Sequence, residues 1–80
     1  LARIEMGEKI IKQKTGIQQV RVRDIDGIAR IEVEPEKLDL FNDIITKNEI
    51  FSKFKMIGFS DVEIDPDGYK SGKLNLIFKN

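Results

Sequence analysis

The sequence predicts a small α+β domain: one sheet of three strands, or four if the C-terminal segment also pairs, with two helices packed on one face. Two segments place apolar residues at helical spacing, three segments alternate with a period of two, and these segments occur in the order helix, strand, strand, helix, strand. A chain of 80 residues holds one hydrophobic core. We therefore expect residues 1–80 to form a single domain.

The first helix is expected from Ala2 to Lys14, where apolar residues recur on one side and charged residues occupy the other. Ile4, Gly7 and Ile11 would face the core. Gly16 follows the last turn, and Lys12 and Lys14 suit the negative end of the helix dipole. The helix is therefore expected to stop just before Gly16.

A hairpin is expected next, with strands over residues 17–23 and 28–33. The intervening Asp24-Ile25-Asp26-Gly27 contains the Asp-Gly pair that tolerates the positive φ angles of a tight turn. Alternation predicts two faces. Val20, Val22, Ala29, Ile31 and Val33 would face inward, and Arg21, Arg23, Arg30 and Glu32 outward.

A second helical region is expected to open at Glu34-Pro35-Glu36 and to end at Gly58. Asn48 interrupts its apolar stripe, which leaves two possibilities: one bent helix, or a short helix followed by a longer one capped near Asn48. The predicted buried stripe consists of Leu38, Phe41, Ile44 or Ile45, Phe51, Phe54 and Ile57.

The third strand is expected around Val62 and Ile64, which alternate with acidic residues, and Pro66-Asp67-Gly68 is expected to be a turn. Residues 69–78 are ambiguous, because they alternate like a strand but are short and contain glycine.

The amino-acid composition excludes several common kinds of metal site and catalytic site. The chain has no Cys and no His, so it offers no thiolate or imidazole for zinc or for nucleophilic catalysis, and its serines have no His partner. We expect neither a catalytic residue nor a metal site here. The 14 basic side chains balance the 14 acidic ones, which argues against nucleic-acid binding. No apolar run approaches the roughly 20 residues that span a bilayer, so we expect no membrane contact and a cytoplasmic location.

The outward-facing arginines are the most informative group. Arg21 and Arg23 would project from one face about 7 Å apart, and with Arg30 on the partner strand they could bind a phosphate or carboxylate bidentately. The alternative is a solvated sheet face with cross-strand Arg-Glu pairs. The acids at 61, 63 and 65 repel one another unless a cation lies nearby, and we expect the row of Arg21 and Arg23 to supply it.

Four short motifs occur in an order and spacing that resemble the C-terminal part of the LarE family, the PP-loop ATP pyrophosphatases that act as ATP-dependent sulfur transferases. They are Gln19-Val20-Arg21-Val22-Arg23-Asp24, Ile28-Ala29-Arg30-Ile31-Glu32-Val33, Ile57-Gly58-Phe59 and Gly68-Tyr69-Lys70-Ser71-Gly72.

The resemblance implies a larger parent enzyme, of which this chain would be a C-terminal fragment without activity of its own. An N-terminal domain would bind ATP and Mg²⁺, release pyrophosphate and transfer sulfur to a pyridinium mononucleotide. Arg21 and Arg23 match arginines that hold the substrate phosphate in the family. Lys70 stands where the family has arginine, and Arg30 and Glu32 would support the site.

Three kinds of partner follow from the resemblance: the chain's own N-terminal ATPase domain, a phosphorylated small-molecule substrate, and further copies in a homo-oligomer. The alternative role is a non-catalytic oligomerisation module of a PP-loop protein with another acceptor. In that case the charged sheet face would pack against a subunit rather than a substrate.

Overall fold

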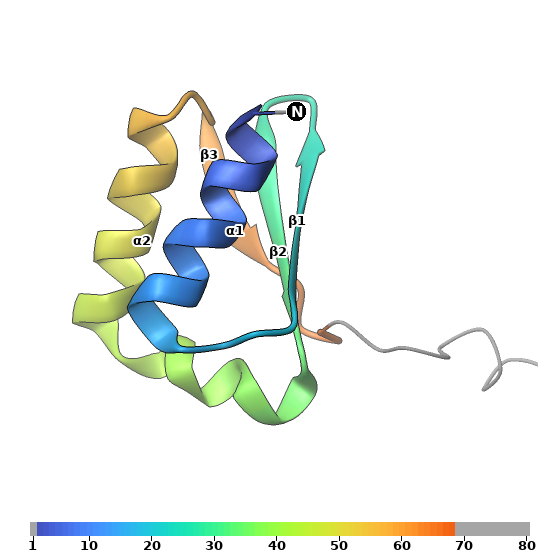
Figure 1. Cartoon of the computed structure of the whole chain (residues 1–80), viewed down its shortest axis with the longest axis vertical. Helices are drawn as coiled ribbons and strands as arrows, with labels where there is room; N and C mark the ends of the chain where they lie inside the picture. The colour runs from blue at the N-terminus through green and yellow to red at the C-terminus, as the bar shows by residue number, and fades with distance from the viewer. Residues whose placement is uncertain (1, 69–80) are drawn as a thin grey trace, which may run out of the picture.

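A computed structural model describes residues 2–68 of the chain (Figure 1). The predicted α+β class and element order are confirmed for these residues, with an additional 3₁₀ helix before the second α-helix. The elements are α1 Ala2–Thr15, β1 Val20–Ile25, β2 Ile28–Val33, η1 Pro35–Asn42, α2 Ile44–Met56 and β3 Asp61–Ile64. Lys70 and the possible fourth strand within 69–78 lie outside the described residues.

The three strands of the described part form one mixed sheet with β2 in the centre. β1 pairs antiparallel with β2, and β3 pairs parallel with β2. The connection from β2 to β3 runs through η1 and α2, which is the crossover that a parallel pair requires. α1 and α2 cover one face of the sheet together (Figure 1), as expected. The charged side chains of the strands alternate with the buried ones and lie on the opposite face.

The hairpin turn forms as its sequence predicts. Asp26 and Gly27 both adopt positive φ, at 53° and 89°, and Ile25 pairs with Ile28 on either side. This is the geometry of a two-residue turn whose twist matches that of the strands. The Asp24 carboxylate accepts a hydrogen bond from the Gly27 backbone N–H at 3.0 Å, which stabilises the turn.

α1 ends where expected. Gly16 has φ of 79°, and its N–H donates to the Lys12 carbonyl at 2.9 Å, so the glycine closes the last turn in a conformation that other residues adopt at a cost. On its flank, Glu8 accepts a hydrogen bond from the Val22 N–H at 3.1 Å. That contact satisfies a backbone donor on the outer edge of β1, where strands are prone to pair with other chains.

Of the two possibilities for the second helical region, a short helix followed by a longer one is confirmed, but the cap expected near Asn48 is wrong. The second helical region divides at Asp43, which is the N-cap of α2 and accepts hydrogen bonds from the Ile45 N–H at 3.3 Å and the Thr46 hydroxyl at 2.7 Å. Asn48 lies exposed within α2. The helix ends as predicted, with Gly58 at φ of 119°. Asp43 is a better cap because its carboxylate meets the positive helix end directly.

The new cap position changes which residues of α2 are buried. Ile44 and Ile45 are both 68% exposed, so the expectation that one of them joins the core is wrong. Ile50, absent from the predicted stripe, is fully buried together with Phe54 one turn later. Because α2 begins directly after Asp43, its first two residues, Ile44 and Ile45, point toward solvent.

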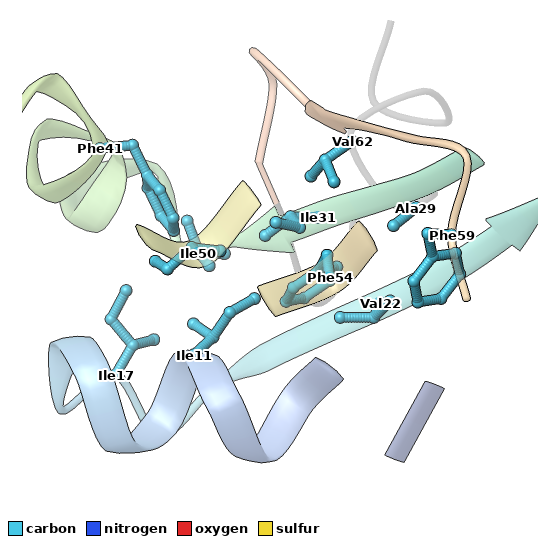
Figure 2. Packing of buried hydrophobic residues seen from close by; sticks show 11 residues of the cluster. Ile11, Ile17, Val22, Ala29, Ile31, Phe41, Ile50, Phe54, Phe59 and Val62 are labelled. Carbon is cyan, nitrogen blue, oxygen red and sulfur yellow. The ribbon is translucent and has the colours of Figure 1, made fainter. Parts of the chain in front are cut away.

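The core lies between the helix pair and the sheet (Figure 2). Phe54 is at its centre, with its ring stacked on Phe59 at a centroid distance of 5.6 Å. The strands contribute the inward residues that alternation predicts. The fully or almost fully buried apolar residues are Ile11, Ile17, Val22, Ala29, Ile31, Val33, Phe41, Ile50, Phe54, Phe59 and Val62.

Neither α1, with 14 residues, nor α2, with 13, has the length and apolar character to cross a membrane, and no other helix among residues 2–68 does.

Candidate functional site

The candidate site is the face of the sheet turned away from the helices, here called the outer sheet face. Alternation along each strand places one set of charged side chains on it. These residues are Arg21 and Arg23 on β1, Arg30 and Glu32 on β2, and Asp61, Glu63 and Asp65 on or just after β3.

Arg21 and Arg23 share the outer sheet face, as the sequence predicts, and both are exposed. In the register of the hairpin, Arg21 lies opposite Glu32 and Arg23 lies opposite Arg30. The two arginines therefore stand on the same side of β1 at the spacing of alternate strand residues, about 7 Å.

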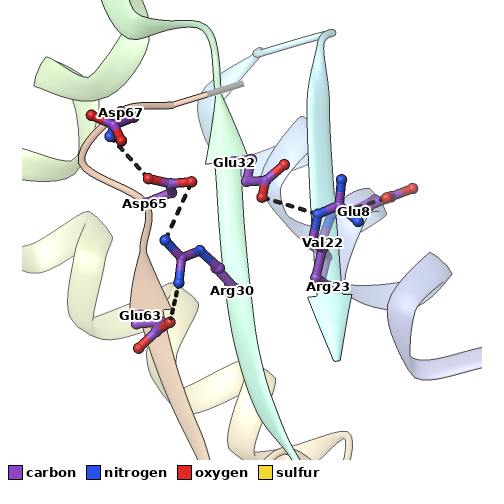
Figure 3. A network of polar contacts seen from close by, with 8 residues as sticks. All are labelled: Glu8, Val22, Arg23, Arg30, Glu32, Glu63, Asp65 and Asp67. Carbon is purple, nitrogen blue, oxygen red and sulfur yellow. Dashed lines mark hydrogen bonds and ion pairs between the residues drawn. The ribbon is translucent and has the colours of Figure 1, made fainter. Parts of the chain in front are cut away.

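Glu32 holds Arg23 in place (Figure 3). The Arg23 Nε donates to Glu32 Oε2 at 3.0 Å, while the Arg23 side chain remains 49% exposed and that of Glu32 only 13%. One edge of the guanidinium is thus engaged, and its terminal N–H groups are available for a second partner. A carboxylate that orients an arginine in this way reduces the entropy the arginine loses when it binds an anion.

Arg30 has a different role. Its Nη1 donates to Glu63 Oε2 at 3.1 Å, and its Nη2 lies 3.5 Å from Asp65 Oδ2 (Figure 3). Two carboxylates from the β3 side therefore share one guanidinium. This arginine neutralises acids on its own sheet, and the pairing leaves less of its charge for an external ligand.

These contacts correct the expected partner of the acidic strand. The row of Arg21 and Arg23 was expected to offset the acids at 61, 63 and 65, but Arg30 does so for Glu63 and Asp65. The reason is topological: β2 lies between β1 and β3, so the β1 arginines are two strands away from the acids. Arg23 instead pairs with Glu32 of the central strand.

Asp65 is the residue of this region that sequence reasoning missed. It is one of the acids on or beside the third strand, and only 6% of it is accessible. Its Oδ1 accepts the Asp67 N–H at 2.9 Å, and its own N–H donates to the Ile31 carbonyl at 2.9 Å. The Asp-Pro-Asp-Gly sequence carries the signal, because Asp side chains commonly bond to the backbone two residues on.

Within residues 2–68 no three Asp, Glu, His or Cys side chains are arranged to hold a metal ion. Exposed guanidinium groups such as those of Arg21 and Arg23 are groups that form charge-assisted hydrogen bonds to anions, and Glu32 holds that of Arg23. Lys70, the third cation of the sequence prediction, lies outside the described residues.

Fold and site together define a small α+β domain with a helix layer on one side and an open, charged mixed sheet on the other. In sequence, the chain is 39% identical over 69 residues to the uncharacterized protein slr1717 of Synechocystis sp.. The match covers 86% of this chain and 26% of that protein, so the chain spans about a quarter of the length of its relative. No family model matches the chain.

Proposed function

We propose that this chain is the C-terminal substrate-binding domain of a PP-loop ATP-dependent sulfur transferase of the LarE type. Its part in the reaction is to hold the phosphate of a pyridinium mononucleotide while the N-terminal domain, with ATP and Mg²⁺, activates the substrate carboxylate. The observation that carries the proposal is the pair of exposed arginines on one sheet face, with Arg23 oriented by Glu32.

The residues act by positioning rather than by making bonds. A phosphate monoester at the β1 edge accepts charge-assisted hydrogen bonds from the guanidinium groups of Arg21 and Arg23. Holding the phosphate fixes the remainder of the substrate relative to the activating domain, and such fixation lowers the entropic part of the barrier. Lys70 is the third cation of this proposal, by its place in the Gly-Tyr-Lys-Ser-Gly motif.

Two further observations support the assignment. The described residues contain neither a phosphate-binding glycine loop of the P-loop kind nor a metal-ligand cluster, so the proposal assigns ATP and Mg²⁺ to the N-terminal domain. The relative from Synechocystis is much longer than the segment it shares with this chain, which is compatible with a domain inside a larger enzyme.

The test is a calorimetric titration of the full-length protein with nicotinic acid mononucleotide, a pyridinium mononucleotide. Arg21→Ala and Arg23→Ala should each weaken binding about tenfold, the effect of losing one charge-assisted contact. Arg23→Lys keeps the charge but loses the planar guanidinium that can donate two parallel hydrogen bonds. Its affinity should therefore lie between those of Arg23→Ala and the native protein. Lys55→Ala removes an exposed cation on α2 and should leave binding unchanged.

The alternative role, an oligomerisation module that uses the outer sheet face, gives the opposite pattern. In that case Arg21→Ala and Arg23→Ala alter the sedimentation coefficient of the full-length protein while its affinity for the mononucleotide stays the same. That result would refute the phosphate-binding role.

A further inference from the structure

The solvent side of α2 exposes apolar side chains at both of its ends. Ile45 in the first turn is 68% exposed, and Met56 at the last position is 84% exposed. Neither is needed for helix formation, and each exposes apolar surface to water at a cost. Between them the exposed surface is polar, with Glu49 and Ser52.

These residues form one stripe with an internal symmetry. Positions 45, 49, 52 and 56 recur at helical spacing, so they share one side of α2. Reversing the helix about its midpoint exchanges Ile45 with Met56 and Glu49 with Ser52. When two copies of α2 lie antiparallel, the apolar side chain at one end of a copy therefore faces the apolar side chain at the other end of its partner. In the same way the carboxylate acceptor of Glu49 faces the hydroxyl donor of Ser52. A surface of this kind is complementary to a second copy of itself related by a twofold axis.

Three of the four stripe residues border a hollow on the surface of α2. A shallow hollow of about 440 Å³ lies along α2 where it faces α1, lined by Lys14, Asn48, Glu49, Ser52, Lys53 and Met56. Lys14 and Glu49 bridge its two sides with an ion pair at 3.2 Å. Met6, on α1, is a further exposed apolar side chain of the same helix layer, at 47%.

We propose that the chain forms a twofold dimer in which α2 packs antiparallel on α2 of a second copy. Ile45 of one copy contacts Met56 of the other, and this contact occurs twice. The Ser52 hydroxyl donates to Glu49 across the axis. Lys53 borders the same hollow as Glu49 and Ser52, so it adds charge complementarity to the opposing carboxylate.

This dimer uses the helix layer, whereas the proposed phosphate contacts lie on the opposite side of the sheet. The two proposals are therefore independent, because the dimer contact does not involve Arg21 or Arg23. One helix pair makes a small interface, for which association in the micromolar to millimolar range is expected.

The experiment is sedimentation equilibrium of the 80-residue chain over a range of concentrations. Ile45→Glu should raise the dimer dissociation constant about tenfold, because it replaces an apolar contact that occurs twice in the dimer by a charge. Ile44→Glu is the matched control: Ile44 has the same exposure and also lies in the first turn, but it projects about 100° away around the helix. It should leave the dissociation constant unchanged.

Introduced charges test whether Ile45 of one copy lies opposite Met56 of the other. Met56→Lys alone should weaken the dimer, and the double variant Ile45→Glu, Met56→Lys should recover it, because the two introduced charges meet across the axis. Far-UV circular dichroism verifies that each variant folds.

Three outcomes would each overturn the proposal. They are a chain that stays monomeric at every concentration, equal losses of affinity for the Ile44 and Ile45 variants, and no recovery of the dimer in the double variant. Arg21→Ala should not change the dissociation constant, so failure here leaves the phosphate proposal standing.

Discussion

Arg3, in the first turn of α1, donates from Nε to Oδ2 of Asp24 on β1 at 2.7 Å. The same guanidinium donates from Nη1 to the Gly58 carbonyl at 2.9 Å and lies over the Phe59 ring, 4.9 Å from its centroid. One side chain thus joins the start of α1, the hairpin and the connection from α2 to β3. Asp24 in turn supports the hairpin turn through the Gly27 N–H.

Acid should weaken this junction. The hydrogen bond from Arg3 is the main reason why the pKa of Asp24 lies below its ordinary value of 3.8, with the Gly27 N–H also lowering it, against an opposing effect of burial. Because the folded-state pKa is lower than the unfolded one, the stabilisation is complete above pH 3.8 and is lost as the pH falls through the folded-state pKa.

Urea unfolding across this pH range tests the junction. Asp24→Asn should be less stable than the native chain at pH 7, and the two should converge once the pH is below the folded-state pKa of Asp24. Asp26→Asn, at the adjacent turn position, is the control, because Asn also tolerates positive φ. A difference between native and Asp24→Asn that stays constant with pH would contradict this account.

Gly7 should not tolerate alanine, although alanine normally stabilises a helix by about 1 kcal/mol over glycine. A Cβ at this position would lie 2.9 Å from Cζ of Phe54 and 3.0 Å from its Cε2, at the centre of the core. We expect Gly7→Ala to destabilise the fold by about 1 to 3 kcal/mol, the usual cost of overpacking. Chemical denaturation measures the loss.

A smaller side chain at position 54 should relieve the crowding. The double variant Gly7→Ala, Phe54→Leu is expected to be more stable than the sum of the single effects allows, because the two sites are in contact. Strict additivity would show that Phe54 does not restrict position 7.

The cap of α2 distinguishes Asp43 from Asn48. Asp43→Ala removes the acceptor for the Ile45 N–H and the Thr46 hydroxyl, and should cost about 0.5 to 2 kcal/mol of unfolding free energy. Asn48→Ala replaces an exposed residue inside the helix by a better helix former, and should be neutral or slightly stabilising. Thermal unfolding of both variants measures the difference, and the reverse order would place the cap at Asn48.

Local chemistry explains what could be predicted from the sequence. The hairpin turn depends on two neighbouring residues, Asp26 and Gly27, and the direction of Arg21 and Arg23 follows from strand alternation alone. These features require no knowledge of distant elements, and the structure agrees with them.

The errors concern features that depend on position within the whole fold. The exposure of Ile44 and Ile45 follows from where the helix starts, and a shift of a few residues rotates every side chain of a helix. The pairing of Arg30 with Glu63 follows from the order of strands in the sheet, which alternation does not reveal. The low exposure of Asp65 results from the turn that packs after β3.

The order of strands also produces a gradient of charge across the outer sheet face. Arginines stand along one edge strand, acids along the other, and the central strand carries one of each, so the potential changes sign across the sheet. For the proposed phosphate-binding role, this charge distribution should attract an approaching anion toward Arg21 and Arg23 and repel it from Asp61 and Glu63. It follows from that proposal that raising the ionic strength should slow phosphate capture.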